Sequence, residues 1–408
     1  MKFSIRYLLI LFIVFSSCDN HQDDSYVLLI SFDGFRADYL DWFDTPNMDR
    51  FIKNGVRAKG MIPVFVSKTF PNHYSIATGM YAENHGLIGN HFYDAELDEN
   101  YTLSDRSKVQ DSKFYGGEPI WVTAEKQGLK TASYFWVGTE APIGGIYPSK
   151  WKKYEHNFPF EARIDSIVSW FSLPLKERPR FSLLYFHEPD WTGHETGPRS
   201  QETAAVVSHL DSLFGDLISK LEQLPISNNL NIIAVADHGM AEISSERTVD
   251  LSAYTDMSQI IQEGSGPYAF LYSKKKNIIE PAVDQLKKAE HISVYLKSDI
   301  PDRYHFKNHH RIKDALIVAD EGWYIQNQAI SSSSTAGEYV PTGGTHGYDN
   351  QLKSMHALFI AQGPAFKNDI VTEPFENVNI YPMIAHILGI DPSKKIDGNL
   401  NNIKHLLK

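Results

Sequence analysis

The sequence predicts an α/β protein with a doubly wound, mostly parallel sheet flanked by helices. Three apolar runs carry this prediction, Tyr26–Phe32, Phe181–Phe186 and residues 230–236, and acidic residues follow each of them closely. Continuous apolar runs of this length are typical of parallel strands that are covered on both faces. Between the second and third runs, residues 201–224 have apolar positions at helical spacing. Strands alternating with helices indicate a doubly wound sheet.

Further elements are predicted along the chain. A helix is expected from Thr69 to Gly79, because the Thr69 hydroxyl can cap free backbone N–H groups and glycine suits the other end. Between residues 264 and 330, short alternating runs surround one helical stretch, which predicts a smaller inserted α+β region within a domain covering 26–400. Residues 331–344 are rich in Ser, Gly and Thr and are expected to form a loop. Helices are also expected over 46–55, 120–127, 164–171 and 381–389, strands over 131–137 and 355–361, and surface loop and hairpin up to Gly117.

Composition and charge narrow the class of protein. The chain has 408 residues with 42% hydrophobic residues, which is enough to bury a large core. Its formal net charge of −11 argues against a general nucleic-acid-binding surface, which needs clustered Lys and Arg. No stable nucleic-acid partner is therefore expected.

The N-terminus predicts export. Lys2 and Arg6 precede an apolar run over residues 7–15, and small residues then lead to Cys18, the only cysteine. This order resembles a bacterial lipoprotein signal, in which residues 1–17 are removed and Cys18 becomes a lipidated N-terminus. Residues 18–25 would then form a tether, and the protein would be anchored to a membrane of the cell envelope, in the periplasm or on the outer surface. A plain secretory signal or a signal anchor is the alternative.

A set of acids and histidines is spaced like metal ligands. Asp33, Asp190 and Asp237 lie at or just past the ends of predicted parallel strands, where open α/β sheets build their sites. Asp190 and His194 are four residues apart, which suits two ligands on one helical turn. Mixed carboxylate and imidazole ligands favour zinc or another borderline divalent ion. Taken singly, each residue is as readily explained by a turn or a loop; the set also includes His238, next to Asp237, and His346, in a glycine-rich segment.

The predicted helix at Thr69 links this set to phosphoryl chemistry. A helix N-terminus favours a bound anion such as a phosphate. A metal ion beside the Thr69 hydroxyl would make it a nucleophile at neutral pH.

Five motifs, taken in order, resemble the nucleotide pyrophosphatase/phosphodiesterase family of the alkaline phosphatase superfamily. They are SFDGFR (31–36), KTFPNHYSIATGMYAENHGLIGN (68–90), EPDWTGHETGP (188–198), ADHGM (236–240) and GGTHGYDN (343–350). The resemblance implies an alkaline phosphatase-like fold, two zinc ions and a threonine nucleophile that forms a covalent nucleotidyl intermediate. It also implies the ligands: Asp190, His194 and His346 for one zinc, and Asp33, Asp237, His238 and the Thr69 hydroxyl for the other. Asn90 occupies the position that donates a hydrogen bond to a non-bridging phosphate oxygen.

The same resemblance predicts the substrate side of the site. Phe70, Trp136 and Tyr154 fall where the family places aromatic residues around a nucleobase, although core packing is an alternative for Trp136 and Tyr154. Glu140 stands where relatives have an acid that accepts from an exocyclic amine of the base. The expected activity is hydrolysis of nucleotides or nucleotide derivatives to nucleoside 5′-monophosphates.

Other functions fit the same metal ligands. A phospholipid-headgroup phosphodiesterase and an alkaline phosphomonoesterase are the enzymatic alternatives. A single contact from Asn90, without a basic clamp for a terminal phosphate, counts against the phosphomonoesterase. An inactive lipoprotein that only binds nucleotide or zinc would have lost a ligand or the nucleophile, and the sequence retains all of them.

Overall fold

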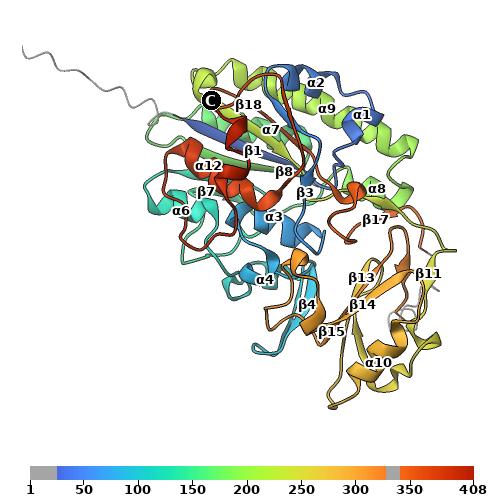
Figure 1. The fold of residues 1–408 in the computed structure, drawn as a ribbon. Helices are drawn as coiled ribbons and strands as arrows, with labels where there is room; N and C mark the ends of the chain where they lie inside the picture. The colour runs from blue at the N-terminus through green and yellow to red at the C-terminus, as the bar shows by residue number, and fades with distance from the viewer. Residues whose placement is uncertain (1–24, 328–340) are drawn as a thin grey trace, which may run out of the picture.

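The computed structural model describes residues 25–327 and 341–408, and Figure 1 shows a large sheet between two layers of helices with a smaller lobe beside it. Residues 1–17, Cys18, most of the predicted tether and most of the predicted 331–344 loop lie outside the described residues. Among the described helices, none has both the length and the apolar character that a membrane crossing requires.

The large sheet has eight strands and confirms the predicted mostly parallel arrangement. Strand β18 (Phe359–Gln362) is antiparallel to both of its neighbours, β9 (Leu230–Val235) and β2 (Val56–Ala58). All other neighbouring strands are parallel. Every residue of the central strand β1 is buried, as its continuous apolar run predicts. In spatial order the strands are β19 (Ile370–Thr372), β2 (Val56–Ala58), β18 (Phe359–Gln362), β9 (Leu230–Val235), β1 (Tyr26–Phe32), β8 (Phe181–Phe186), β6 (Thr131–Tyr134) and β7 (Lys150–Lys152).

Helices cover both faces of this sheet (Figure 1). The long helix α9 (Gln201–Glu222) packs with α2 (Pro46–Lys53) and α7 (Phe160–Phe171) on one side. On the other side, α3 (Thr69–Thr78), α6 (Ile120–Lys126) and α12 (Ile380–Leu388) pack against one another. The helix that carries Thr69 is therefore held by the core, and eight of its ten residues are buried.

Helix α7 begins at Phe160 and not at residue 164 as predicted, and two strand boundaries differ from the prediction for local backbone reasons. The strand predicted over 131–137 ends at Tyr134, because Phe135 adopts a φ of 73°, which no strand residue can adopt. The strand predicted over 355–361 begins at Phe359, since Lys353–Met355 form a short 3₁₀ turn instead. In the first case the chain turns just before Trp136, which places that side chain beyond the sheet edge.

The smaller lobe contains a four-stranded antiparallel sheet in the order β12 (Ile261–Glu263), β13 (Tyr268–Tyr272), β15 (Ala315–Ala319) and β14 (Ile292–Leu296). Helix α10 (Ile279–Leu286) packs on it, and the two share a hydrophobic core separate from that of the large sheet. The remaining α-helices and strands of the described residues are short: α1 (Tyr39–Trp42), β3 (Met61–Ile62), α4 (Ala82–His85), β4 (His91–Asp94), β5 (Glu99–Thr102), α5 (Arg106–Val109), α8 (Asp190–Thr196), β10 (Ala241–Glu242), β11 (Thr248–Val249), β16 (Tyr324–Ile325), β17 (Gly344–Thr345) and β20 (Phe375–Glu376).

Candidate active site

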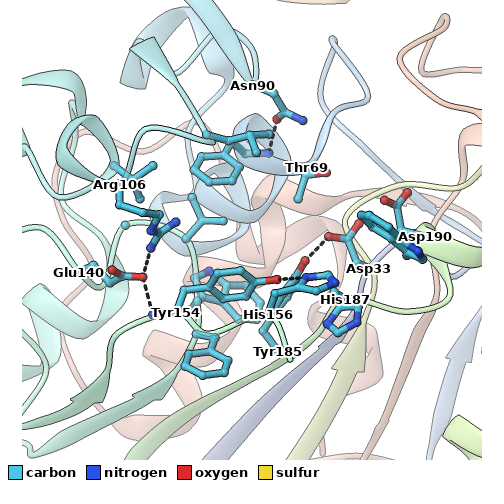
Figure 2. A pocket seen from close by; sticks show the side chains of 18 of the residues that line it. Asp33, Thr69, Asn90, Arg106, Glu140, Tyr154, His156, Tyr185, His187 and Asp190 are labelled. Carbon is cyan, nitrogen blue, oxygen red and sulfur yellow. Dashed lines mark hydrogen bonds and ion pairs between the residues drawn. The ribbon is translucent and has the colours of Figure 1, made fainter. Parts of the chain in front are cut away.

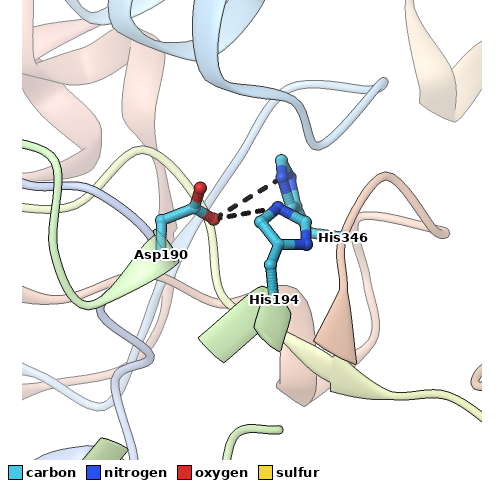
Figure 3. Close-up of side chains that lie close together, drawn as sticks. All are labelled: Asp190, His194 and His346. Carbon is cyan, nitrogen blue, oxygen red and sulfur yellow. Dashed lines mark ion pairs between the residues drawn. The ribbon is translucent and has the colours of Figure 1, made fainter. Parts of the chain in front are cut away.

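Two groups of acids and histidines lie at the carboxyl end of the large sheet. The inner group consists of Asp33, Asp237 and His238, all buried, which follow β1 and β9. The outer group consists of Asp190 and His194, on helix α8, together with His346 (Figure 3). Within each group, one ligand atom from every residue lies within 4.8 Å of the others. The structure thus brings the six side chains together in the two sets that the resemblance implies.

A short strand pair brings His346 to this place. β17 pairs antiparallel with β10, and Thr345 lies opposite Ala241, just beyond the Asp237–His238 segment. As a result, the His346 ring stacks on the His238 ring with centroids 3.5 Å apart and planes inclined by 16°. The inner and outer groups are therefore neighbours.

All three histidines present the same nitrogen to the carboxylates. Nδ1 of His194, His238 and His346 lies 2.7 to 2.9 Å from a backbone carbonyl oxygen, so it carries the proton and donates it. Nε2 is then the atom with a free lone pair. It lies 3.4 Å (His194) and 3.6 Å (His346) from Asp190 Oδ1, and His238 Nε2 is 2.9 Å from Asp237 Oδ2. This orientation is the usual one for metal-binding histidines.

The carboxylates also fit a cation. Asp33 Oδ2 accepts from the Tyr185 hydroxyl at 2.6 Å, and Asp237 Oδ1 accepts from the Gly34 N–H at 3.1 Å. The other oxygen of each, and Oδ1 of Asp190, is buried without a hydrogen-bond partner among the described residues. Burial, and then the charges of Asp237 and Asp190, raise the pKa of Asp33 well above its usual range. Divalent cations would satisfy these oxygens and offset the repulsion, so both groups fit metal ions.

Thr69 is the first residue of α3, but its hydroxyl does not cap the helix. Lys68 occupies the N-cap position and no side-chain cap hydrogen bond forms there, so the predicted capping role of Thr69 is wrong. The Thr69 Oγ1 atom instead lies 3.3 Å from His238 Nε2 and faces the inner group. The helix does not need the Thr69 hydroxyl as a cap, because Asn90 Oδ1 accepts from the Phe70 N–H in the first turn at 2.9 Å (Figure 2).

A cavity of about 370 Å³ opens beside Thr69. Figure 2 shows Asp33 and Asp190 at one end of it, Arg106 and Glu140 at the other, and Thr69 between them. The predicted residues Phe70, Asn90, Trp136, Glu140 and Tyr154 all line this cavity.

The predicted substrate residues differ in what they can still contact. Phe70 and Tyr154 are half-buried, with ring surface open to a ligand. Trp136 is only 2% exposed, its indole N–H donates to the carbonyl of His73, and its ring meets the His73 ring edge-on at 5.0 Å. Trp136 therefore forms part of the cavity wall and packs on the helix that carries Thr69.

Several lining residues were not found from the sequence, and Arg106, His156, Tyr185 and His187 are the ones among them with ionisable side chains. Tyr185 holds Asp33 by the hydrogen bond above, and it is hidden in the sequence within an apolar strand. His156 stacks on His187 with ring centroids 4.0 Å apart, and burial, followed by the charge of His156, lowers the pKa of His187 to about 3. Arg106 lies in the polar stretch that was predicted as surface loop and hairpin, and no motif marks it.

A family model for type I phosphodiesterase / nucleotide pyrophosphatase matches residues 27–349, which include both metal-ligand groups and Thr69. The chain belongs to this family. The family lies in the alkaline phosphatase superfamily, and the predicted fold and membership are confirmed.

Members of the phosphodiesterase / nucleotide pyrophosphatase family with curated descriptions are clearly similar to this chain. A venom phosphodiesterase of Naja atra is 40% identical over 405 residues, covering 96% of this chain and 48% of the relative. Ectonucleotide pyrophosphatase/phosphodiesterase family member 3 of Rattus norvegicus is 37% identical over 402 residues, covering 96% of this chain and 45% of the relative. The chain spans about half the length of the curated relatives it matches.

Solved structures of the family have the same fold. Murine ectonucleotide pyrophosphatase/phosphodiesterase 5 superposes with a TM-score of 0.87 at 35% identity, covering 94% of this chain and 100% of that chain. A second structure of that mouse protein is an inactive threonine-to-alanine variant in complex with AMP, with a TM-score of 0.87 at 34% identity.

Proposed function

We propose that this protein is a phosphodiesterase and nucleotide pyrophosphatase that releases nucleoside 5′-monophosphates from nucleotides or nucleotide derivatives. One observation carries the proposal: the Thr69 hydroxyl, which does not cap its helix, lies 3.3 Å from His238 Nε2 of the inner group and lines the cavity. Its place at a helix N-terminus suits a phosphate group. The activities named for the venom and rat relatives, and the AMP complex of the mouse relative, support the same function.

The proposal includes two zinc ions. Asp33, Asp237, His238 and the Thr69 hydroxyl would hold one of them, and the outer group would hold the other. When bound, the ions supply Lewis acidity, which stabilises the deprotonated nucleophile and neutralises charge on the phosphoryl oxygens. The carboxylate and imidazole donors, with three buried carboxylate oxygens that have no hydrogen-bond partner among the described residues, suit zinc.

The residues of the chain would carry the covalent steps. Thr69 Oγ gives its proton to solvent and bonds to the phosphorus, while the bond from phosphorus to the leaving oxygen breaks and that oxygen keeps the electron pair. The oxygen of a water molecule then bonds to the phosphorus and the Thr69–phosphorus bond breaks; one proton of the water restores the Thr69 hydroxyl, and the nucleoside 5′-monophosphate is released. The Asn90 carbonyl is engaged by Phe70, so its amide N–H₂ is the part that faces a non-bridging phosphate oxygen. Phe70 and Tyr154 would stack on the base.

A nucleotide suits the cavity better than a lipid. The end remote from the two metal-ligand groups holds the charged side chains of Arg106 and Glu140. An acyl chain lying there would offer no acceptor to the remaining N–H donors of Arg106, at a cost in binding free energy. A nucleobase offers polar edges at the same place.

A parallel assay tests the proposal. ATP, a nucleotide sugar, a lysophospholipid and a phosphomonoester are offered to the purified protein with and without a chelator. We expect turnover of the first two to nucleoside 5′-monophosphates and loss of this turnover with chelator. Faster turnover of the lysophospholipid or the phosphomonoester would overturn the proposed substrate class.

We also propose, from the sequence of residues 1–18, that the protein is exported and anchored to the cell envelope through lipid on Cys18. Metabolic labelling with a fatty acid tests this proposal. The wild type should be labelled and a Cys18→Ala variant should not be, and labelling of both would contradict it.

A further inference from the structure

Arg106 and Glu140 form an ion pair at the end of the cavity remote from the two metal-ligand groups (Figure 2). Arg106 begins the short helix α5, and Glu140 follows β6, so the pair joins two segments of the cavity wall. If the phosphate of a nucleotide lies at Thr69, as the proposed function requires, its base lies toward this pair.

Glu140 has little capacity left to bind a substrate. Its Oε1 accepts from Arg106 Nη2 and from the Tyr154 N–H at 2.9 Å, and its Oε2 accepts from Gln110 Nε2 at 2.9 Å. The carboxylate is 5% exposed. An exocyclic amine of a base would have to displace one of these donors, so the acceptor role that the resemblance implies for Glu140 is already filled by the protein.

Arg106 retains donors that face the cavity. A guanidinium has five N–H groups and no acceptor, and the ion pair with Glu140 engages Nη2. The Arg106 Nε atom is itself buried, without a hydrogen-bond partner in the part of the chain that the structure describes, so the donors left for a ligand are those of Nη1 and the second N–H of Nη2. The Arg106 Cζ atom is 5.4 Å from the centroid of the Tyr154 ring, and its side chain is 31% exposed. A base stacked on Tyr154 would therefore meet hydrogen-bond donors at its edge.

We propose that Arg106 selects substrates whose base carries acceptors at this edge, so that 6-keto purine nucleotides are preferred over 6-amino purine nucleotides. A 6-keto purine offers the O6 and N7 acceptors side by side, which match the guanidinium fork. In adenine the amino group replaces O6 and would set a donor against a donor. Glu140 is a positioning residue in this account, because it aims the guanidinium and neutralises its charge.

The test compares ITP with ATP, whose bases differ in the group on C6 and in the hydrogen on N1 and present the same N7, by pyrophosphate release. We expect kcat/KM to be about tenfold higher for ITP in the wild type. Arg106→Met should bring the ratio of the two values to about one. Arg106→Lys keeps the charge opposite Glu140 but loses the fork, and it should lower the ratio as well. Lys108→Met is the matched control, because Lys108 is in the same helix but pairs with Glu99 outside the cavity; it should leave the ratio unchanged.

Failure of this inference is distinguishable from failure of the proposed function. Bis(4-nitrophenyl) phosphate has no base, so the wild type and the Lys108→Met control should hydrolyse it at similar rates whatever the ratio for ITP and ATP is. Equal kcat/KM for ITP and ATP in the wild type, or an unchanged ratio in a folded Arg106→Met variant, would overturn the selection by Arg106. Absence of turnover for both nucleotides and for the base-free diester would instead overturn the phosphodiesterase assignment.

Discussion

The side-chain oxygen of Asn90 accepts a hydrogen bond from the backbone N–H of Phe70, twenty residues earlier in the chain, at 2.9 Å. This contact supplies the acceptor that the N-terminus of α3 otherwise lacks, since its N-cap residue forms no side-chain hydrogen bond. It also fixes the amide so that its N–H₂ group remains for the substrate. One side chain thus stabilises the helix that carries Thr69 and offers a donor to the phosphate.

Replacing Asn90 separates these two roles. Asn90→Asp retains an oxygen for the Phe70 N–H but replaces the donor by a negative charge, so we expect kcat/KM to fall about 10²-fold or more with little loss of stability. Asn90→Ala removes both, and should also lower the free energy of unfolding by about 1 kcal/mol. Steady-state kinetics with a nitrophenyl diester and denaturant unfolding measure the two effects. An active Asn90→Asp variant would contradict the donor role.

The two metal-ligand groups should be separable by mutation. We expect metal analysis to give two zinc ions per chain for the wild type, and about one each for Asp237→Asn, in the inner group, and His346→Ala, in the outer group. A chelator should abolish activity and lower the unfolding temperature, because ions bound only by the folded state stabilise it by about 4 kcal/mol at a thousandfold excess over Kd. An unfolding temperature that does not respond to chelator would argue against resident metal ions.

Tyr154 should matter for the base and not for the chemistry. Its truncation in Tyr154→Ala removes one stacking surface, worth about 1–3 kcal/mol. We expect kcat/KM for ATP to fall roughly tenfold to a hundredfold, while hydrolysis of a small nitrophenyl diester changes little. Equal losses on both substrates would show that Tyr154 has no base-stacking role.

We expect the stability of the fold to depend on pH through His85, which lies outside the active site. It is buried, its Nδ1 accepts from the Leu87 N–H at 3.1 Å, and its Nε2 lies 2.9 Å from Ser75 Oγ, so the neutral ring is satisfied. Burial, followed by the charges of His309 and Arg311, lowers its pKa to about 3.

The unfolded state, with a His85 pKa near 6.5, binds the proton more readily than the folded state does. Stability is therefore complete above pH 6.5 and is lost as the pH falls toward 3. At pH 5 the preference of the proton for the unfolded state lowers the free energy of unfolding by about 2 kcal/mol through His85. His85→Asn retains an acceptor for the Leu87 N–H but does not titrate. The loss of unfolding free energy between pH 7.5 and pH 5 should be smaller in this variant by about that amount, and an equal loss would contradict the assignment.

Much of the fold could be predicted because the central strands of the large sheet are continuous, largely apolar runs. The runs that form β1, β8 and β9 bury every residue, and Asp33 and Asp237 follow from where two of these runs end. The early end of β6 could not be predicted, because it depends on the positive φ of Phe135, a residue type that rarely adopts it.

The site was predictable where its residues form motifs and not where tertiary contacts decide. The placement of His346 depends on a pairing of only two residues per strand, β10 with β17, which no local pattern marks. The cap of α3 was predicted to be Thr69. The side chain that accepts from the first turn belongs instead to Asn90, which comes from a separate segment and which no local pattern links to the helix. Arg106 was missed since a polar residue in a polar stretch gives no periodic signal, and only its partner Glu140 shows where it points.

The central claim is that Thr69 is the nucleophile. The most direct measurement compares Thr69→Ala and Thr69→Ser with the wild type in ATP hydrolysis, after metal analysis shows that all three bind the same zinc. The account predicts that Thr69→Ala loses on the order of 10³-fold or more in kcat, since no other group replaces its oxygen, and that Thr69→Ser retains measurable turnover. Turnover by folded, zinc-loaded Thr69→Ala at a rate near that of the wild type would contradict it.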